Sequence, residues 1–561
     1  MSIAWWHNPG LLLILSGLVL PLLPWRLRQL GLLLAPATAI ALLLQIPQGT
    51  LIQTQWLSYQ LAPLRLDELA FIFALIFLIA TALCGLFMLH LRGRLEPACA
   101  LIYAGAAVAA VLAGDLITLF FYWETTALAS ALVILANGPQ TLPVVMRYLV
   151  IQISSGLLLM AGAIVHIQAT GSTEFAHLGL DAPGGWLILL AFGIKAAFPF
   201  LHNWLQDSYP AASPTGTVVL SAFTTKLAIY ALARGYAGTE ILIPIGAAMT
   251  AFPIFYAVIE NDLRRVLAYS LNNQLGFMVV GVGIGTEMAL NGTAAHAFTH
   301  ILYKALLFMS MGAVLLRAGT VNGSDLGGLY KSMPFTTVFC IVGAASISAF
   351  PLFSGFVSKS LILSSSAYEG YWIVWMILLF ASAGVFHHSG IKIPFFAFFG
   401  HDSGIRCKEA PLNMLLAMGI TAAACIGIGC MPGLFYQLLP YPVDYAPYTS
   451  SHVLSQMQLL LFSALAFTVL MRTGIYPPEL RSTNLDFDWV YRRLGPNIVG
   501  VMRRKLAQLY SGLGQTATQV RDYGLQGWHR ASAWSETLGT GAMASAVLIL
   551  LGLYLWMFYS A

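Results

Sequence analysis

The sequence predicts an all-α polytopic membrane protein with about sixteen transmembrane helices, an inverted repeat and two broken helices. Hydrophobic residues make up 58% of the 561 residues and charged residues only 9%, whereas soluble globular chains carry about 25% charged residues. Apolar stretches of roughly the 20 residues needed to span a bilayer recur along the chain. Basic residues gather in alternate connections between these stretches, as in a chain that crosses the membrane repeatedly.

The predicted spans begin close to the N-terminus. Many spans follow the first apolar stretch and no A-x-A-like cleavage site is evident, so we interpret this stretch as a retained helix rather than a signal peptide. The spans near residues 192 and 345 are interrupted by prolines. The span centres lie near residues 18, 38, 78, 106, 127, 155, 192, 226, 250, 274, 302, 345, 380, 423, 462 and 550.

Charge predicts the side of the membrane that each connection occupies. Of the 27 Lys and Arg residues, 21 lie in the odd-numbered loops and in the polar stretch before the last span. Two, Arg65 and Arg234, lie in even-numbered loops, and the remaining four are lysines inside spans. The positive-inside rule therefore places the odd loops in the cytoplasm of a bacterial cell and both termini outside. Short basic loops also explain the net charge of +5 without a nucleic-acid partner.

The distribution of charge divides the chain into five predicted regions. Spans without intramembrane charge form a scaffold, two transport repeats follow, and later spans lead to a polar stretch. That stretch predicts an amphipathic helix on the cytoplasmic membrane surface, followed by one last span. The regions are 1–95 (scaffold), 96–240 (first repeat), 241–400 (second, inverted repeat), 401–477 (C-terminal spans) and 478–561 (amphipathic segment and last span).

A short internal repeat marks the two broken helices. Ala197-Phe198-Pro199 recurs as Ala349-Phe350-Pro351, an offset of 152 residues. Each proline interrupts an apolar helix, because proline lacks the backbone N–H and clashes with the preceding turn. The two breaks fall in the seventh and the twelfth span, an odd difference of five, so the two units have opposite orientations in the bilayer. Broken helices in inverted repeats indicate a transport path. The alternative is that proline is simply frequent in membrane helices.

Five charged residues lie inside the apolar spans: Glu124, Lys195, Lys226, Lys304 and Lys359. Each costs about 2.5–3.5 kcal/mol on insertion scales when placed near the bilayer centre, so these residues indicate an ion or proton path. Two alternatives remain. Either Glu124 and a lysine of a neighbouring helix form a fixed ion pair that locks the helices, or Lys195, Lys226 and Lys359 extend to the membrane surface.

A histidine stripe lies between the charges of the two repeats. His296, His300 and Lys304 follow one another at intervals of four residues, which places them on one helix face. Histidine titrates near neutral pH, so the stripe favours a proton relay that ends on a lysine. Simple packing and a metal site are the alternatives, and the nearby lysine disfavours a metal cation.

No cofactor or metal is predicted. None of the six cysteines forms a C-x-x-C pair, and most lie in apolar spans, where a thiol packs as a small hydrophobe. The glycines of Gly281-Val282-Gly283-Ile284-Gly285 fall inside a span and indicate close helix packing rather than dinucleotide binding.

Four further polar residues lie outside the charged positions and the histidine stripe described above. His202 follows Lys195 on roughly the same helix face. His387, His388 and Lys392 lie near the end of the thirteenth span, where either a cytoplasmic proton outlet or a solvated loop accounts for them.

Together these motifs resemble the antiporter-like subunits of respiratory complex I and of Mrp-type cation/proton antiporters. The resemblance covers residues 65–400 and rests on Trp123-Glu124, on Lys195 followed by Ala-Ala-Phe-Pro-Phe-Leu-His-Asn-Trp-Leu, on Lys226, on His-x3-His-x3-Lys at 296–304, and on Ser-Gly-Phe-x-Ser-Lys at 354–359. Within this group the chain looks most like the D subunits of Mrp antiporters. It differs from them in its C-terminal extension and in the stretch His387-His388-Ser389-Gly390-Ile391-Lys392, where an arginine is usually expected.

The resemblance implies that Glu124, Lys195, Lys226, Lys304 and Lys359 carry protons, with His296 and His300 between the two repeats. It implies a subunit of a multi-subunit Na+/proton antiporter whose partners are other integral membrane subunits, and no redox cofactor in this chain. The rival interpretations are a proton-pumping subunit of a redox complex, a subunit of an inorganic-carbon uptake complex, and a membrane scaffold with vestigial charges.

Overall fold

The computed structural model describes residues 4–482, 484–508 and 549. The chain divides into two units, Met1–Asn484 and Leu485–Ala561, and each is described by itself. The first unit contains all the candidate site residues.

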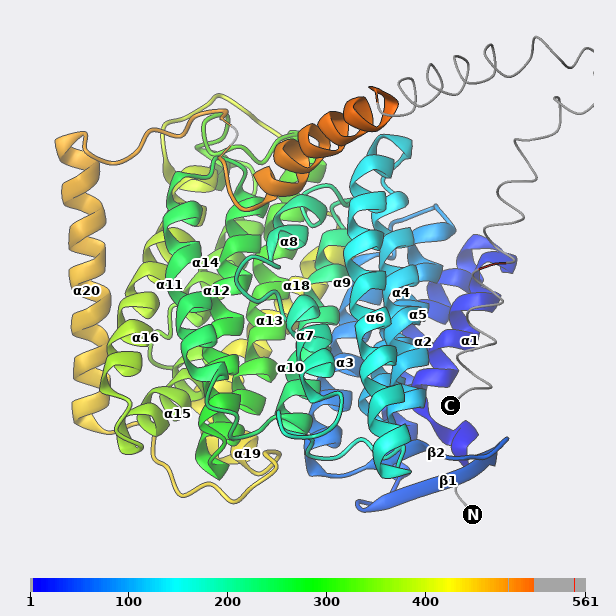
Figure 1. The fold of residues 1–561 in the computed structure, drawn as a ribbon. Helices are drawn as coiled ribbons and strands as arrows, with labels where there is room; N and C mark the ends of the chain where they lie inside the picture. Colours follow the sequence, from blue (N-terminus) through cyan, green and yellow to red (C-terminus); the bar gives the residue numbers. More distant parts are fainter. Residues whose placement is uncertain (1–3, 483, 509–548, 550–561) are drawn as a thin grey trace, which may run out of the picture. The chain divides into compact units, whose positions relative to one another are not determined.

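The first unit is a bundle of helices that run up and down between two ends (Figure 1). Among the described residues, ten helices are long and apolar enough to cross a membrane, and four further apolar helices are shorter. The prediction of a helical polytopic membrane protein is confirmed. Its elements are η1 (Trp5–His7), α1 (Pro9–Val19), η2 (Leu20–Leu22), α2 (Trp25–Gln45), β1 (Thr50–Trp56), β2 (Tyr59–Leu66), α3 (Glu68–Phe87), α4 (Leu95–Val111), α5 (Leu116–Leu135), η3 (Pro139–Thr141), α6 (Leu142–Thr170), α7 (Gly185–Lys195), α8 (Asn203–Ser208), α9 (Gly216–Ala222), α10 (Thr224–Gly235), α11 (Leu242–Ile259), α12 (Leu263–Ile284), α13 (Glu287–Ala318), η4 (Leu329–Lys331), α14 (Pro334–Ile347), α15 (Ser354–Tyr368), α16 (Trp372–Val385), η5 (Phe386–Ile391), α17 (Lys392–Pro394), η6 (Phe395–Phe399), α18 (Leu412–Cys430), α19 (Pro432–Tyr436) and α20 (Ser450–Thr473).

The count of sixteen spans stays a prediction. Fifteen of the predicted centres fall within helices of the first unit. The sixteenth, near residue 550, lies outside the described residues.

A β-hairpin interrupts the helical pattern, which the sequence did not predict. Strands β1 and β2 pair antiparallel, with Trp56 opposite Tyr59 at the turn. Two backbone hydrogen bonds fix β2 to the α4–α5 connection: Gly114 N donates to Ala62 O at 2.7 Å and Arg65 N to Leu112 O at 2.7 Å. The hairpin therefore covers one end of the bundle rather than crossing it.

The two predicted helix breaks have the same backbone geometry. In the first, between α7 and α8, Ala197 and Phe200 have φ of 61° and 69°. In the second, between α14 and α15, Ala349 and Leu352 have φ of 56° and 73°. These are left-handed conformations, which side-chain-bearing residues rarely adopt. Ala349 lies 152 residues after Ala197, and Leu352 lies 152 residues after Phe200. The two broken helices run in opposite directions (Figure 1).

Two further irregularities were not predicted. The eighth span is broken at Phe223, between α9 and α10. The thirteenth span contains two π-helical stretches, η5 and η6. Such departures from α-helical geometry free backbone carbonyls within a span and often mark functional positions.

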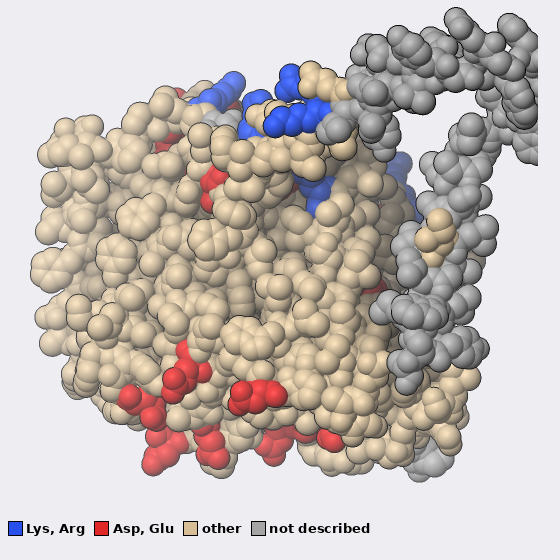
Figure 2. Space-filling view, viewed as in Figure 1, with Lys and Arg blue, Asp and Glu red and all other residues tan. Residues whose placement is uncertain are grey.

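The two ends of the first unit differ in charge. Figure 2 shows acidic side chains gathered at the lower end of this face. We call this the acidic end; its exposed acids are Glu174, Asp181, Glu240, Glu287, Glu369 and Asp444. At the opposite, basic end the connections carry the exposed residues Arg26, Arg92, Arg94, Lys331, Arg406 and Lys408.

The second unit is described over residues 485–508 and at residue 549. It contains a π-helical turn, η7 (Val490–Leu494), and residues 495–508 are helical. Residues 498–508 belong to the predicted amphipathic helix, whose remainder lies outside the described residues.

Candidate functional site

Glu124 lies in a space that a glycine leaves open. It is on α5, half-buried, and faces α6 at Gly156, where an added Cβ would overlap the Glu124 carboxylate. Glu124 Oε1 is buried and has no hydrogen-bond partner among the described residues. A buried carboxylate oxygen in this state requires water or a proton to satisfy it.

Lys195 reaches α5 beside Glu124 without pairing with it. It is the last residue of α7 and is fully buried. Its ammonium donates to Trp123 O at 2.6 Å and to Thr126 Oγ1 at 3.0 Å, and it lies 4.4 Å from the centre of the Trp123 ring. The fixed Glu124–Lys195 ion pair that the sequence left open is therefore not formed among the described residues.

Lys226 caps the break in the eighth span. It lies in the first turn of α10, and its ammonium donates to Ser221 O, near the end of α9, at 2.7 Å. The carbonyl end of a helix carries partial negative charge and stabilises a cation. The unpredicted break at Phe223 is thus what gives Lys226 its binding partner.

Lys359 caps the second broken helix in the same way. Its ammonium donates to Ile347 O, the last residue of α14, at 2.7 Å. The offset of 152 residues pairs Ile347 with Lys195, which ends α7. The first half of each broken helix therefore ends beside a lysine, but Lys195 extends from the end of α7 to α5, whereas Lys359 binds the carbonyl end of α14.

The histidine stripe lies on α13, in the middle of the bundle. His296 Nδ1 is 3.1 Å from Ser358 Oγ, and its Nε2 is 3.4 Å from Tyr303 OH. The rings of His296 and His300 are 6.1 Å apart, and neither nitrogen of His300 has a hydrogen-bond partner among the described residues. α13 contacts α10 and α15, which places the stripe between the elements that carry Lys226 and Lys359.

A chain of hydrogen bonds leads from Lys304 towards the thirteenth span. The Lys304 ammonium donates to Ser270 Oγ at 2.9 Å and to Leu267 O at 3.2 Å. Ser389 Oγ donates to Ser270 Oγ at 2.8 Å and is 2.8 Å from His388 Nδ1. This chain connects the central stripe with η5.

His388 and Lys392 are buried, so the solvated loop considered from sequence is wrong. Both are 0% exposed. The Lys392 ammonium donates to Val258 O at 2.6 Å and to Glu260 O at 2.7 Å, at the C-terminal end of α11, and pairs with Glu479 Oε1 at 2.9 Å. His202 is also buried, with its ring 4.6 Å from that of Phe252.

All four lysines of the candidate path are 0–1% exposed, so none extends to the membrane surface. The hydrogen-bond acceptors of their ammonium groups described above are neutral oxygen atoms. A lysine held by neutral acceptors can lose its proton without leaving a carboxylate unpaired, which suits a relay better than a fixed ion pair.

Buried amides accompany the charged residues, and sequence reasoning missed them. Among the described residues, the side chains of Gln152, Gln206 and Asn272 are buried without hydrogen-bond partners. Gln274 accepts from Tyr303 OH at 3.0 Å, next to the histidine stripe. Unsatisfied buried amides indicate ordered water. The available signal was the occurrence of Gln and Asn inside apolar spans.

Glu96 was also missed. It is buried in the first turn of α4 and accepts hydrogen bonds from Ser213 Oγ at 2.7 Å and from Thr215 Oγ1. Its place near a span end, rather than mid-span, is why the sequence did not single it out.

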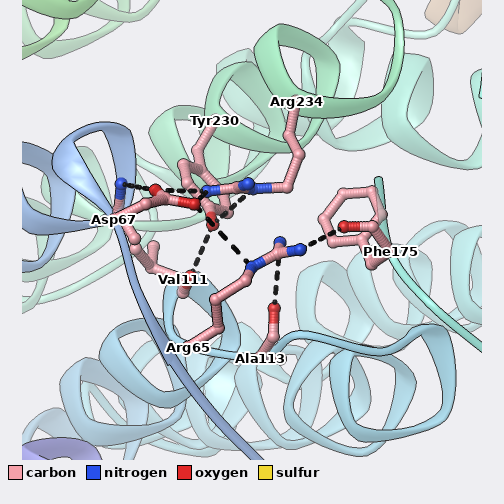
Figure 3. A network of polar contacts seen from close by, with 8 residues as sticks. Arg65, Asp67, Val111, Ala113, Phe175, Tyr230 and Arg234 are labelled. Carbon is pink, nitrogen blue, oxygen red and sulfur yellow. Dashed lines mark hydrogen bonds and ion pairs between the residues drawn. The ribbon is translucent and has the colours of Figure 1, made fainter. Parts of the chain in front are cut away.

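A separate charge network ties the β-hairpin to α10 (Figure 3). Arg234 Nη2 donates to both oxygens of Asp67, at 2.7 and 2.8 Å, and Arg65 Nη1 donates to Phe175 O at 2.6 Å. Burial by itself raises the pKa of Asp67, but the charge and hydrogen bonds of Arg234 outweigh it, and the pKa is lowered. Both basic residues that the sequence places in even loops therefore have a structural role.

No group of three His, Cys, Asp or Glu side chains within the described residues is arranged to hold a metal ion.

Comparison with known proteins relates this geometry to one family. The family profile described as "NADH:quinone oxidoreductase/Mrp antiporter, TM" matches residues 113–386. The chain is 30% identical over 355 residues to the D subunit of the Na(+)/H(+) antiporter of Alkalihalophilus pseudofirmus, covering 59% of this chain and 71% of that protein. It is 26% identical over 412 residues to hydrogenase-4 component B of Escherichia coli, covering 65% of this chain and 61% of that protein.

A solved structure shares the fold. A chain of the Mrp complex from Dietzia sp. DQ12-45-1b superposes with a TM-score of 0.75 at 23% identity, covering 97% of this chain and 62% of that one. At this identity the likeness shows the fold alone.

Proposed function

The chain belongs to the NADH:quinone oxidoreductase/Mrp antiporter transmembrane family, and on that premise we propose that it is a proton-translocating membrane subunit of a multi-subunit Na+/proton antiporter. The observation that carries the proposal is the series of buried ionisable groups from Glu124 to Lys359. Their lysines are held by neutral oxygens, two of them at helix breaks. Insertion costs make such a series improbable without a transport role.

Protons move between the groups through changes of charge and through water. Glu124 takes up a proton in the space beside Gly156, and its charge acts on Lys195, whose ammonium binds the same turn of α5. Removing the negative charge makes the Lys195 ammonium less favourable and drives its proton onward. Lys226, the histidine stripe and Lys359 follow, with the buried amides holding the connecting water.

The division into residues 96–240 and 241–400 is part of the proposal. The equal backbone geometry of the two breaks, 152 residues apart, supports two inverted transport repeats. Each repeat supplies one broken helix to the path.

The proposed location is the inner membrane of a bacterial cell, with the basic end in the cytoplasm. The positive-inside rule supports this orientation, because 21 Lys and Arg residues lie in the odd loops and the polar stretch, against Arg65 and Arg234 in the even loops. The proposed partners are other integral membrane subunits, since the relatives named above are components of larger assemblies.

The test uses everted membrane vesicles that contain the assembled complex. Added Na+ is expected to collapse a preformed pH gradient, and Glu124→Gln is expected to lower this response about 100-fold or more, because it removes the proton-binding group and retains its size. Glu240→Gln, at an exposed acid, is the matched control and keeps the wild-type response. A full response from Glu124→Gln in an assembled complex contradicts the proposal.

A second candidate function is proton pumping in a redox complex, which the similarity to hydrogenase-4 component B favours. In that case the pH gradient depends on oxidation of an electron donor and does not respond to Na+ or other monovalent cations. The same vesicles distinguish the two functions.

A further inference from the structure

Glu479, which lies outside the two predicted repeats, pairs with a buried lysine near the end of the second repeat. Residues 475–482 follow α20 and lie against the basic end of the first unit; we call them the strap. Most of the strap is exposed, yet the Glu479 side chain is only 6% exposed and pairs with Lys392, which is 0% exposed, at 2.9 Å. The strap thus brings one carboxylate to the buried lysine of the thirteenth span.

Two anchors hold the strap on either side of Glu479. Before it, the ring of Tyr476 stacks on that of His387, with centroids 5.7 Å apart and an angle of 7° between the planes. After it, Arg481 pairs with Asp325 at 2.8 Å. Glu479 is therefore positioned by its neighbours and does not depend on its own ion pair for its place.

The two groups of the pair have different surroundings. The Lys392 ammonium binds carbonyl oxygens at the end of α11 in addition to Glu479. Glu479 Oε2 has no hydrogen-bond partner among the described residues, and the adjacent Pro478 and Leu480 are exposed. The residues on both sides of Glu479 are therefore in contact with solvent, while its buried Oε2 can still accept a hydrogen bond.

The hydrogen-bond chain that starts at Lys304 ends at His388, close to the Lys392–Glu479 pair along the thirteenth span. That chain passes through Ser270 and Ser389 to His388, and Lys392 follows His388 by four residues, about one turn on the same side of the helix. The line of groups therefore continues from the centre of the bundle to the strap.

We propose that Glu479 and Lys392 form a proton-exchange site, through which the 241–400 region of the path opens to water at the basic end. The proposal rests on the proposed proton transport. Lys392 transfers one proton from its ammonium to the Glu479 carboxylate, which leaves a neutral amine and a carboxylic acid. The acid then releases that proton to water, and the amine takes up another from the side of His388.

Other charged groups around the site define its response to pH. Glu260 lies beside it at the end of α11, with Arg265 3.9 Å from the Glu260 carboxylate. His387 and Tyr476 face it from η5 and from the strap itself. Burial raises the pKa of Glu479 and Glu260 adds to this, while Lys392 acts in the opposite direction. A raised pKa brings the carboxyl closer to neutral pH, where it can exchange protons.

The test compares variants of the assembled complex in everted vesicles, with proton movement measured between about pH 6 and pH 9. We expect Glu479→Gln to lower the rate about tenfold or more. Glu479→Asp keeps a protonatable group and is expected to restore transport with a shifted pH profile. The control Glu240→Gln, at an exposed acid of the opposite end, keeps the wild-type rate. A Glu479→Gln complex with the wild-type rate and pH profile overturns the proposal.

A second measurement does not depend on transport. A hydrophobic carbodiimide modifies protonated carboxyl groups, and mass spectrometry reports the modified fraction of Glu479 and of the exposed Glu240. We expect modification of Glu479 to increase as the pH falls, and to increase several-fold in Lys392→Met, while Glu240 does not respond to the Lys392 change. Modification of Glu479 that depends neither on pH nor on Lys392 overturns the proposal. If Lys392→Met fails to assemble, the pH dependence of the wild-type protein decides by itself.

The two failures can be told apart. Wild-type vesicles without a cation-dependent or redox-dependent pH response contradict the proposed function, and the carbodiimide experiment still decides whether Glu479 exchanges protons with its surroundings. Wild-type transport with an inert Glu479 contradicts only the proton-exchange site.

Discussion

The 96–240 and 241–400 regions contain helix breaks with similar backbone angles, but the acid near their buried lysines lies at a different place in the chain. In the first, Glu124 lies mid-span on α5, beside Gly156. The offset of 152 residues places Gly276 at the equivalent position of the second, and Gly276 packs closely against Gly246 of α11. In the second region the acid that pairs with a buried lysine, Lys392, is Glu479, which follows α20 in the chain.

The backbone geometry of the two helix breaks therefore does not determine which residues supply the charged groups. The two breaks have similar φ angles, whereas their lysines bind differently: Lys195, at the end of α7, donates to α5, and Lys359, on α15, donates to the last carbonyl of α14. In the proposed path, lysines bound to neutral oxygens and acids near them come from different positions in the two regions.

The largest expected effect comes from the lysines that cap the helix breaks. Lys226→Met and Lys359→Met remove the proton-carrying group and leave Ser221 O and Ile347 O without their donors. We expect each to lower transport about 100-fold in everted vesicles. If the two regions are equivalent in function, the two losses are equal; a loss confined to one variant shows that only one region carries the protons.

Gly156→Ala tests the space around Glu124. The added Cβ overlaps the carboxylate and must displace it. Because a displacement of about 1 Å can cost up to about 100-fold in rate, we expect a loss of at least about tenfold. Gly427→Ala is the matched control, since Gly427 lies in α18 with open space around it, and it keeps the wild-type rate. Unchanged transport in Gly156→Ala means that Glu124 does not act from this position.

A smaller effect is expected from Ser389→Ala, which cuts the hydrogen-bond chain between Lys304 and His388. The hydroxyl makes two hydrogen bonds, each worth about 1 kcal/mol, so we expect the rate to fall at least about fivefold. Ser382→Ala, at another buried serine of the same span, is the control. If Ser389→Ala and Ser382→Ala have equal transport rates, protons do not pass along the hydrogen-bond chain between Lys304 and His388.

The smallest effect concerns stability rather than transport. Ala197→Gly and Ala349→Gly relieve the left-handed conformation at the two breaks, and each is expected to stabilise the protein by about 1 kcal/mol. Ala191→Gly, inside α7, is expected to destabilise it by about 0.5–1 kcal/mol. Thermal unfolding in detergent measures these shifts. Opposite signs at Ala197 and Ala349 would show that the two breaks are not equivalent.

The sequence predicted the features that depend on side-chain type and spacing. Apolar length gave the spans, Pro199 and Pro351 gave the two breaks, and the five charged residues inside apolar stretches gave the candidate path. These signals are local, since each follows from a cost that a residue has within a bilayer.

What the sequence could not predict depends on contacts between distant segments. The break at Phe223 has no proline or glycine to mark it. The burial of Lys392 depends on the end of α11 and on Glu479, which lie 132 and 87 residues away in the chain. Gly156 was one glycine among 51, and only the position of Glu124 against it reveals its purpose.

The placement of the charged groups along their spans has an electrical consequence. Glu124, Lys226 and Lys304 each lie near the middle of the helical segment that carries them. A charge that crosses the whole membrane gains or loses about 2.3 kcal/mol per 100 mV of membrane potential. A proton that passes between groups at similar depth moves almost along an equipotential, so the potential does little work on this lateral transfer. We therefore expect the voltage dependence of transport to arise in the two steps in which a proton moves between these mid-span groups and the water at either side of the membrane.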